Sequence, residues 1–186
     1  VLFRSYITDF RLEHFKLLVE NVHPDVMLFH DDWGAKNNLF MSPDVWREFI
    51  KPAYQKLYGY LHEQGVIIMH HADSHLELIA SDLEDIYIDI WQGALPQNDL
   101  PKIQKNIKGN MIIMGGIDAA VVDHRQVDEK VIRAEVGRAC REYVPGGHFI
   151  PCLTYGAPGA IFEGVDDIIN DEVEKISARL IAGEPL

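Results

Sequence analysis

The sequence predicts an α/β protein made of about five consecutive βα units, and three observations support this fold class. Five short apolar runs rich in β-branched residues recur along the chain, and each is followed by a stretch with helical periodicity. Each run also ends on polar or small side chains, as at His30, Asp31 and Asp32. Strands are expected at residues 26–30, 66–71, 87–91, 111–115 and 148–152. Because long helical crossovers separate these strands, we expect them to pair in parallel.

Helices are expected between the strands, at residues 6–22, 42–64, 75–83, 99–107, 127–144 and 165–182. The second of these has the clearest start. Ser42 can cap it, Pro43 fits the first helical position, and Asp44 lies in the first turn, where the helix dipole favours a negative charge. Pro52 falls inside the same segment, so the sequence predicts a kink or a break there.

The composition argues against several classes of protein. The chain has 186 residues and a net charge of −12, so a nucleic-acid partner is not expected, because phosphate binding needs a basic face. No apolar stretch approaches the roughly 20 residues of a membrane span, and no signal peptide is visible, so no membrane attachment is expected. Two cysteines, Cys140 and Cys152, are too few for a disulfide framework. The expected compartment is the cytoplasm.

The start of the chain is unusual. It begins without Met, and its first five residues, VLFRS, match the translation of a common sequencing adapter. We therefore expect residues 1–5 to be a non-native leader and residues 6–186 to form one domain. A closed (β/α)₈ barrel needs about 250 residues, and five strands are too few to close one. The domain is therefore expected to be incomplete.

The polar strand ends predict one shared site, because the carboxyl ends of parallel strands meet at one rim. His71 and Asp73 can point the same way, since strand faces alternate with a period of two. With Cys152 they would form a set of three donors with an open fourth position, as in catalytic zinc sites. The alternative is that His71 and Asp73 form a hydrogen-bonded pair that caps the following helix, while Cys152 is buried as a small hydrophobic residue.

Asp31 and Asp32 are candidate catalytic residues, either as a general acid/base pair or as a group that binds a cation. Only one of them is expected to face the centre of the rim, because adjacent strand residues point to opposite faces. The structural alternative is a helix cap or an ion pair with Lys36.

Three further residues at strand ends are candidates for contact with a ligand. Trp33 would form a rigid aromatic wall, and Gln92 would hydrogen-bond a polar substrate. Asp118 lies at an equivalent strand end and is a candidate catalytic residue that could orient the substrate or move its proton.

These residues carry a resemblance to a known family. His30-Asp31-Asp32-Trp33-Gly34, followed by MSPDVWREFIKP at residues 41–52, resembles the central segment of the uroporphyrinogen decarboxylase superfamily. Segments at residues 66–73, 89–92, 114–118 and 146–152 continue the resemblance in order. It implies that the chain is the C-terminal portion of a (β/α)₈ TIM-type barrel, with residues 6–186 as a single incomplete domain.

The superfamily has two main functional branches. True decarboxylases remove carboxyl groups from a porphyrinogen without a cofactor. Cobamide-dependent methyltransferases pass a methyl group between a substrate and the cobalt of a corrinoid protein, and they hold zinc with a His-x-Cys pair and a later Cys. Where decarboxylases have GNLDP, residues 115–119 read GGIDA, and where they have GHG, residues 151–153 read PCL. Both departures favour the methyltransferase branch.

The resemblance implies a particular ligand set. His71 and Cys152 match the zinc ligands of the methyltransferases, and Asp73 stands where the Cys of the His-x-Cys pair would be. Aspartate is a competent zinc ligand, but fewer thiolates leave a more Lewis-acidic ion. A methyl ether or another methylated donor therefore fits this set as well as a thiol does.

The expected function is zinc-dependent methyl transfer between a small methylated substrate or thiol and the corrinoid of a partner protein. Two alternatives remain open at this point. One is a uroporphyrinogen decarboxylase-like lyase that acts on a tetrapyrrole, and the other is a non-catalytic barrel that binds a corrinoid or tetrapyrrole for delivery.

Overall fold

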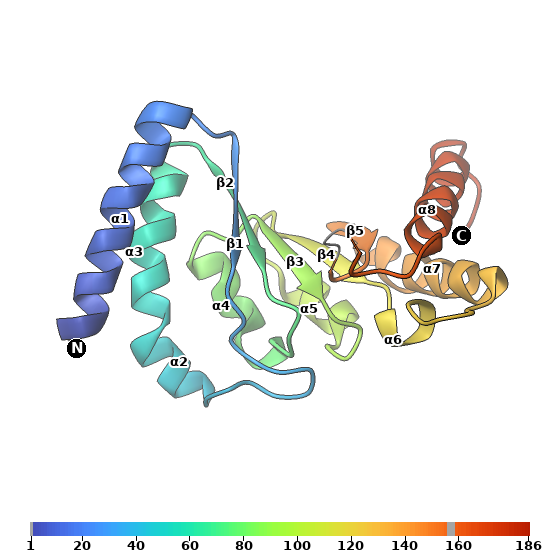
Figure 1. Ribbon diagram of the computed structural model, residues 1–186, viewed down its shortest axis with the longest axis horizontal. Helices are drawn as coiled ribbons and strands as arrows, with labels where there is room; N and C mark the ends of the chain where they lie inside the picture. The colour runs from blue at the N-terminus through green and yellow to red at the C-terminus, as the bar shows by residue number, and fades with distance from the viewer. Residues whose placement is uncertain (1, 156–158) are drawn as a thin grey trace.

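The computed structural model describes residues 2–155 and 159–186. Strands and helices alternate along the chain, and the strands lie between two groups of helices (Figure 1). The strands are β1 (Val26–His30), β2 (Ile67–His71), β3 (Ile90–Ala94), β4 (Ile112–Gly116) and β5 (Phe149–Cys152). The α-helices are α1 (Leu2–Val22), α2 (Pro43–Phe49), α3 (Lys51–Glu63), α4 (Ala80–Asp85), α5 (Leu100–Asn106), α6 (Ala119–Val122), α7 (Glu129–Tyr143) and α8 (Val165–Ile181). Short 3₁₀ turns, η1 (Glu77–Ile79) and η2 (Val144–Gly146), precede α4 and β5.

The five strands form one parallel sheet in the order β1-β2-β3-β4-β5. This order confirms the predicted series of βα units, because each strand pairs with the next one along the chain. Among the described strands, β1 and β5 are the edges, so the sheet is an open part of a barrel wall. None of the described helices is long and apolar enough to cross a membrane.

Four strands lie where the sequence predicts them, but β3 begins three residues later than expected. Tyr87 has a positive φ of 65°, which places it in a turn rather than in extended chain. The Asp89 carboxylate accepts a hydrogen bond from the Ile68 backbone N–H at 2.7 Å, ahead of the first strand residue, Ile90. The strand therefore uses Gln92 and Gly93 as members of the sheet rather than as residues beyond its end.

The break predicted at Pro52 lies just before it. Helix α2 ends at Phe49 and α3 begins at Lys51, which leaves Pro52 in the first turn of the second helix. Proline is tolerated there because the first turn has no intrahelical acceptor for its missing N–H. Ser42 caps α2, and its hydroxyl accepts from the Val45 backbone N–H at 3.3 Å, as expected.

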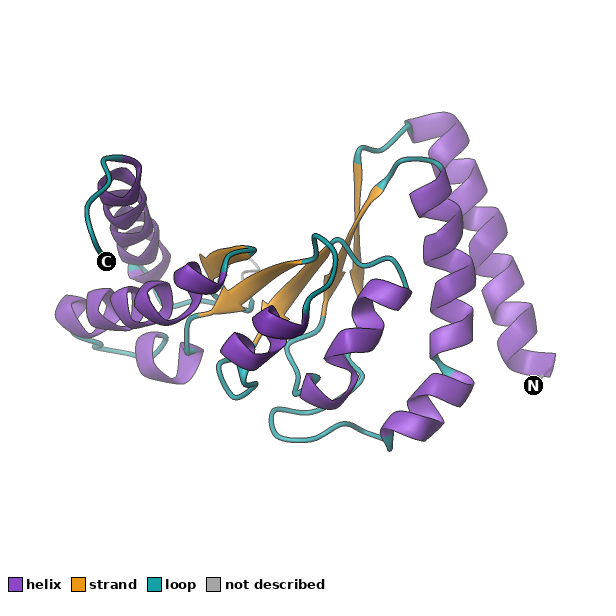
Figure 2. Cartoon of the chain, turned by 180° about the vertical axis from the view of Figure 1, so that it is seen from behind, coloured by secondary structure: helices purple, strands orange, loops and turns teal. Residues whose placement is uncertain are grey.

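The two faces of the sheet differ in their surroundings. Helices α4 and α5 lie in front of the strands in Figure 2 and behind them in Figure 1, so they cover one face. Buried side chains of alternating residues point to that face, including Ile68, Trp91 and Ile113. On the opposite face Val26 and Leu28 are exposed. In a closed barrel this second face would line the interior.

Helices flank the sheet at both ends. α1 packs beside α3 at the N-terminal end, and α7 packs against α8 at the other (Figure 1). Helix α1 begins at Leu2, inside the segment expected to be a leader, and Arg4 donates to the backbone carbonyls of Glu48 and Phe49 at 3.0 and 2.8 Å.

A buried carboxylate joins α4 to the pair α2 and α3. The Asp82 side chain is 7% exposed and accepts hydrogen bonds from Arg47 and Lys51. Burial acts to raise its pKa, but the two cationic donors outweigh burial and hold the pKa below its usual value.

Candidate functional site

The open face of the sheet carries the chemistry at its carboxyl end. The parallel register pairs His30 with His71 and His71 with Gln92, so three polar side chains lie on one row of neighbouring strands. Cys152 follows on β5, on the same face and two residues beyond that row. The side chains expected to share one rim therefore do so for β1, β2, β3 and β5.

Three side chains of this rim lie close enough to share one ion. His30, Asp32 and His71 each offer a donor atom, and these atoms all lie within 4.8 Å of one another. The His30 and His71 rings are 4.2 Å apart between centroids, and His30 Nε2 lies 3.7 Å from Asp32 Oδ2. His30 is 69% exposed and Asp32 32%, so the cluster opens to the interior face.

The ligand set expected from the sequence differs from this cluster in two members. In residues 2–155 and 159–186, the group of His, Cys, Asp and Glu donors that meets the 4.8 Å spacing contains His71, but neither Asp73 nor Cys152. Asp73 lies beside the cluster, because its backbone N–H donates to Asp32 Oδ1 at 3.1 Å. Burial and the Asp32 charge raise the pKa of Asp73 above its usual value, and His71 and His30 oppose that rise.

Sequence reasoning missed His30 as a candidate ligand. The signal was present, because His30 and Asp32 have the same spacing as His71 and Asp73. The structure places the two His-x-Asp motifs side by side on neighbouring strands in exact register. Only knowledge of that register could show that the two motifs meet.

Gln92 joins the metal-ligand candidates on β1 and β2 to β5. Its Oε1 accepts a hydrogen bond from His71 Nδ1, and its amide nitrogen donates to the Thr154 carbonyl at 3.5 Å. Burial raises the pKa of Cys152 to about 12, although hydrogen bonding to Gln92 acts to lower it. At neutral pH the sulfur is therefore a protonated thiol. Gln92, which was expected to bind substrate, instead lies between two protein partners, the His71 ring and the Thr154 carbonyl.

Asp31 and Asp32, directly after β1, have different hydrogen-bond partners. The Asp31 carboxylate accepts a hydrogen bond from the Tyr54 hydroxyl on α3, away from the cluster. The Asp31 backbone N–H donates to the His71 carbonyl at 3.2 Å and extends the β1–β2 ladder. Asp32 is therefore the member of the pair that faces the rim.

Trp33 lies in the core and not on the open rim. It is 3% exposed, and its ring stacks on His70 at 4.2 Å between centroids. Trp46 and Tyr54 meet its ring edge-on, each at 5.0 Å. Trp33 was expected to form an aromatic wall against a ligand. The structure instead buries its ring beneath the strand ends, where it supports them and is not exposed to a substrate.

His70 anchors this support as a neutral side chain. It is fully buried, and burial lowers its pKa to about 4. Nε2 lies 3.0 Å from the Asp31 carbonyl, which can only accept, so Nε2 carries the ring proton of the neutral side chain and donates it. The Tyr58 hydroxyl therefore donates to the unprotonated Nδ1 at 2.8 Å, and burial raises the pKa of Tyr58, which keeps the hydroxyl protonated. Both ring nitrogens are hydrogen-bonded, so His70 holds the end of β1 in place and has no ring nitrogen left to bind a metal.

Asp118 lies at the carboxyl end of β4 and caps α6. Its Oδ1 accepts from the Ala120 backbone N–H at 3.0 Å, and its Oδ2 from Gln97 Nε2 at 3.3 Å. The backbone N–H of Asp118 donates to Glu135 at 2.9 Å. These contacts fix the carboxylate at the rim level, outside the group that meets the ion-binding spacing.

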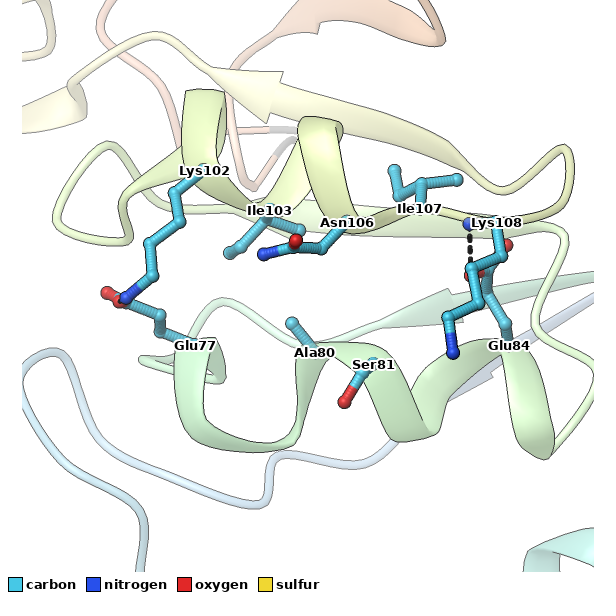
Figure 3. Close-up of a pocket in the computed structure, with 9 residues that line it drawn as sticks. All are labelled: Glu77, Ala80, Ser81, Glu84, Lys102, Ile103, Asn106, Ile107 and Lys108. Carbon is cyan, nitrogen blue, oxygen red and sulfur yellow. Dashed lines mark hydrogen bonds and ion pairs between the residues drawn. The ribbon is translucent and has the colours of Figure 1, made fainter.

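Two hollows in the described structure have the size of a small-ligand site. One of about 310 Å³ lies between α1, α3 and the end of β1, and its lining includes His30, Asp31 and Tyr54. The other, of about 290 Å³, lies between α4 and α5 in the outer helical layer (Figure 3). An ion pair between Glu77 and Lys102 at 2.8 Å spans the second, and it contains none of the rim residues. The first hollow adjoins the candidate site and the second does not.

Comparison with known proteins places the chain in a family. The sequence model described as uroporphyrinogen decarboxylase (URO-D) matches residues 5–169. The chain belongs to this family. Among solved structures, a methyltransferase from Methanosarcina mazei is similar to it, with a TM-score of 0.65 at 18% sequence identity. That alignment covers 91% of this chain and 47% of the methyltransferase, so the chain spans about half the length of that relative. No curated protein sequence matches this chain. The likeness supports the fold, an incomplete (β/α)₈ barrel of the family.

Proposed function

We propose that the chain is part of a corrinoid-linked methyltransferase, which moves a methyl group between a small substrate and the cobalt of a corrinoid carried by a partner protein. The observation that carries the proposal is the cluster of His30, Asp32 and His71 at the strand ends of a URO-D family sheet. Imidazole and carboxylate donors around an exposed position suit a catalytic divalent metal, whereas porphyrinogen decarboxylation needs no metal. The similar solved structure is that of a methyltransferase, which adds support for this branch.

The donor set fits zinc. Two imidazoles and a carboxylate are ordinary zinc ligands, and the exposed His30 leaves the open face free for a substrate atom. Bound there, zinc would act as a Lewis acid on the substrate heteroatom that gains or loses the methyl group. His71 belongs both to this cluster and to the set expected from the sequence, in which Asp73 and Cys152 are the other ligands.

The remaining residues of the rim would bind and orient the substrate. Asp118 is held by its hydrogen bonds at the end of β4, where its carboxylate would accept a proton or a hydrogen bond from a substrate. Asp31 would act through Tyr54, which it orients beside the hollow of about 310 Å³. That hollow is mostly apolar in its lining and would receive the body of a small methylated compound. The proposed compartment is the cytoplasm.

The experiment is a transfer assay on a complete version of the enzyme that contains this chain, because the chain alone is expected to be inactive. Free cobalamin reduced to cobalt(I) is the methyl acceptor, and the cobalt absorption spectrum reports methylation. O-, N- and S-methyl compounds are offered one at a time, and methylcobalamin with thiols tests the reverse direction. We expect zinc-dependent transfer with one of these classes and loss of transfer in His71→Ala. Release of carbon dioxide from uroporphyrinogen would instead favour the lyase alternative. Corrinoid binding without turnover in any assay would favour a delivery protein.

A further inference from the structure

The two His-x-Asp motifs at the ends of β1 and β2 differ in their contacts, and the difference bears on which residues would bind a metal. The in-register pair brings the imidazoles of His30 and His71 together, and Asp32 completes a donor group within 4.8 Å. Asp73 belongs to the same pair of motifs but lies outside that group, and so does Cys152. Asp73 and Cys152 are both among the described residues, so the positions of their donor atoms keep them outside the group.

Gln92 sets the orientation of the shared ligand. Its side-chain oxygen can only accept, so the hydrogen bond to His71 Nδ1 requires the proton on Nδ1. Nε2 of His71 then carries the lone pair and is the atom that can bind a metal. Metal-binding histidines usually donate their second ring N–H in this way, which fixes the ring and its tautomer.

We propose that His30, Asp32 and His71 form a zinc site of nitrogen and oxygen donors, with Gln92 as its positioning residue and without Cys152. The inference rests on the proposed function and deepens it. Two neutral imidazoles and one carboxylate leave a divalent ion with a net positive charge, which makes it a stronger Lewis acid than a thiolate-bound ion. Such a site favours an oxygen ligand in its open position, as in an alcohol or a methyl ether.

Metal titration of the purified chain tests the ligand set with zinc and cobalt(II) as the probes. We expect one equivalent of tightly bound metal, and a cobalt(II) spectrum without sulfur-to-cobalt charge transfer. His30→Gln and Asp32→Asn should weaken zinc binding by more than about 100-fold, beyond the effect usual for outer-shell groups. Asp73→Asn is the matched control, since it removes the same charge from the neighbouring motif, and it should change the affinity by less than about 10-fold. Cys152→Ser should leave the affinity unchanged.

Gln92 is tested by a pair of variants. Gln92→Leu removes the acceptor for His71 Nδ1 and should weaken zinc binding by about 10–100-fold. Gln92→Glu keeps an acceptor in place and should restore the affinity to within a few-fold of wild type. Circular dichroism of each variant checks that the helices are retained, so that a loss of metal is not a loss of fold.

Several outcomes would overturn the inference. They are charge transfer from sulfur in the cobalt(II) protein, loss of metal in Cys152→Ser, an Asp73→Asn defect as large as that of Asp32→Asn, and failure of Gln92→Glu to restore binding. Each of these outcomes concerns the ligand set, whereas the methyl-transfer assay tests the proposed function separately. Conversely, a nitrogen and oxygen metal site in a protein that transfers no methyl group would support the inference and refute the proposed function.

Discussion

Substitution of Asp82 by asparagine should destabilise the fold through the contact between α4 and the pair α2 and α3. The carboxylate is 7% exposed and meets two cations, Lys51 Nζ at 2.7 Å and Arg47 Nη2 at 2.9 Å. Lys51 is 17% exposed and Arg47 is 41% exposed, so the pair with Lys51 is the better shielded from water. Asparagine has nearly the same shape, and the change therefore removes charge and one acceptor rather than packing.

The magnitude lies between two limits. Removing one partner of a fully buried ion pair costs about 3–5 kcal/mol, and an exposed pair contributes about 0.2–1 kcal/mol. Because Asp82 is buried but Arg47 is partly exposed, we expect a loss of about 2 kcal/mol in the free energy of unfolding, roughly 30-fold in the equilibrium constant. Asp85→Asn is the matched control. Asp85 also binds Lys51 at 2.7 Å but is 60% exposed, so its removal should cost about 0.5 kcal/mol or less.

Urea unfolding followed by circular dichroism measures both variants against wild type. The pH adds a second test, because the pKa of Asp82 is held below its usual value of 3.8 in the folded state. A lowered pKa in the folded state gives stability that is present above the unfolded-state pKa and is lost as the pH falls through the folded-state pKa. The difference between wild type and Asp82→Asn should therefore be full at pH 7 and shrink below about pH 4. Equal effects of Asp82→Asn and Asp85→Asn at pH 7 would refute the reasoning.

Three further changes have defined outcomes. Alkylation of Cys152 at pH 8 should be slow, because its pKa is about 12 and little thiolate is present. Added zinc should not slow the alkylation further, and protection by zinc would instead show that the thiol is a ligand. Tyr58→Phe should cost about 1–3 kcal/mol in urea unfolding, because it leaves the buried His70 Nδ1 without a donor, and an unchanged stability would argue against that bond. Gly115→Ala should prevent a stable fold, because an added Cβ would lie 2.4 Å from a carbonyl oxygen of the neighbouring strand. Gly65→Ala, at a positive φ but with open space around it, should cost only about 1 kcal/mol of stability. Similar thermal unfolding of the two variants would contradict this.

Local patterns in the sequence predict most of this fold. The periodicity of the apolar residues located the helices, and the capping Ser42 and the helix-interrupting Pro52 located the ends of α2 and α3. Strand β3 was displaced because its apolar run includes Tyr87, whose turn conformation depends on neighbouring segments and not on its own preference for strands. Parallel pairing followed from the crossover lengths and is confirmed.

The site was only partly accessible from sequence. The alternation of strand faces correctly separated Asp31 from Asp32, because that alternation is a local property of the backbone. The meeting of His30 with His71 depends on the register between two strands 41 residues apart, which no local pattern specifies. Trp33 was expected at the rim because it follows the strand, but its packing on His70 is a tertiary contact.

The pairing of β1 with β2 has a consequence for folding. Met27 and Phe29 pack against the core on one face of β1, whereas Val26 and Leu28 on the open face are 45% and 62% exposed, so burial of apolar side chains fixes the position of β1 along β2 from one face only. A slip by one residue would turn Asp32 to the opposite face and set His30 against a buried side chain. An ion held by both strands would penalise that slip, because only the native alignment binds it. At a free metal concentration about 100 times the dissociation constant, this selection would contribute about 2.7 kcal/mol. The metal would then act as a template for strand alignment as well as a reagent.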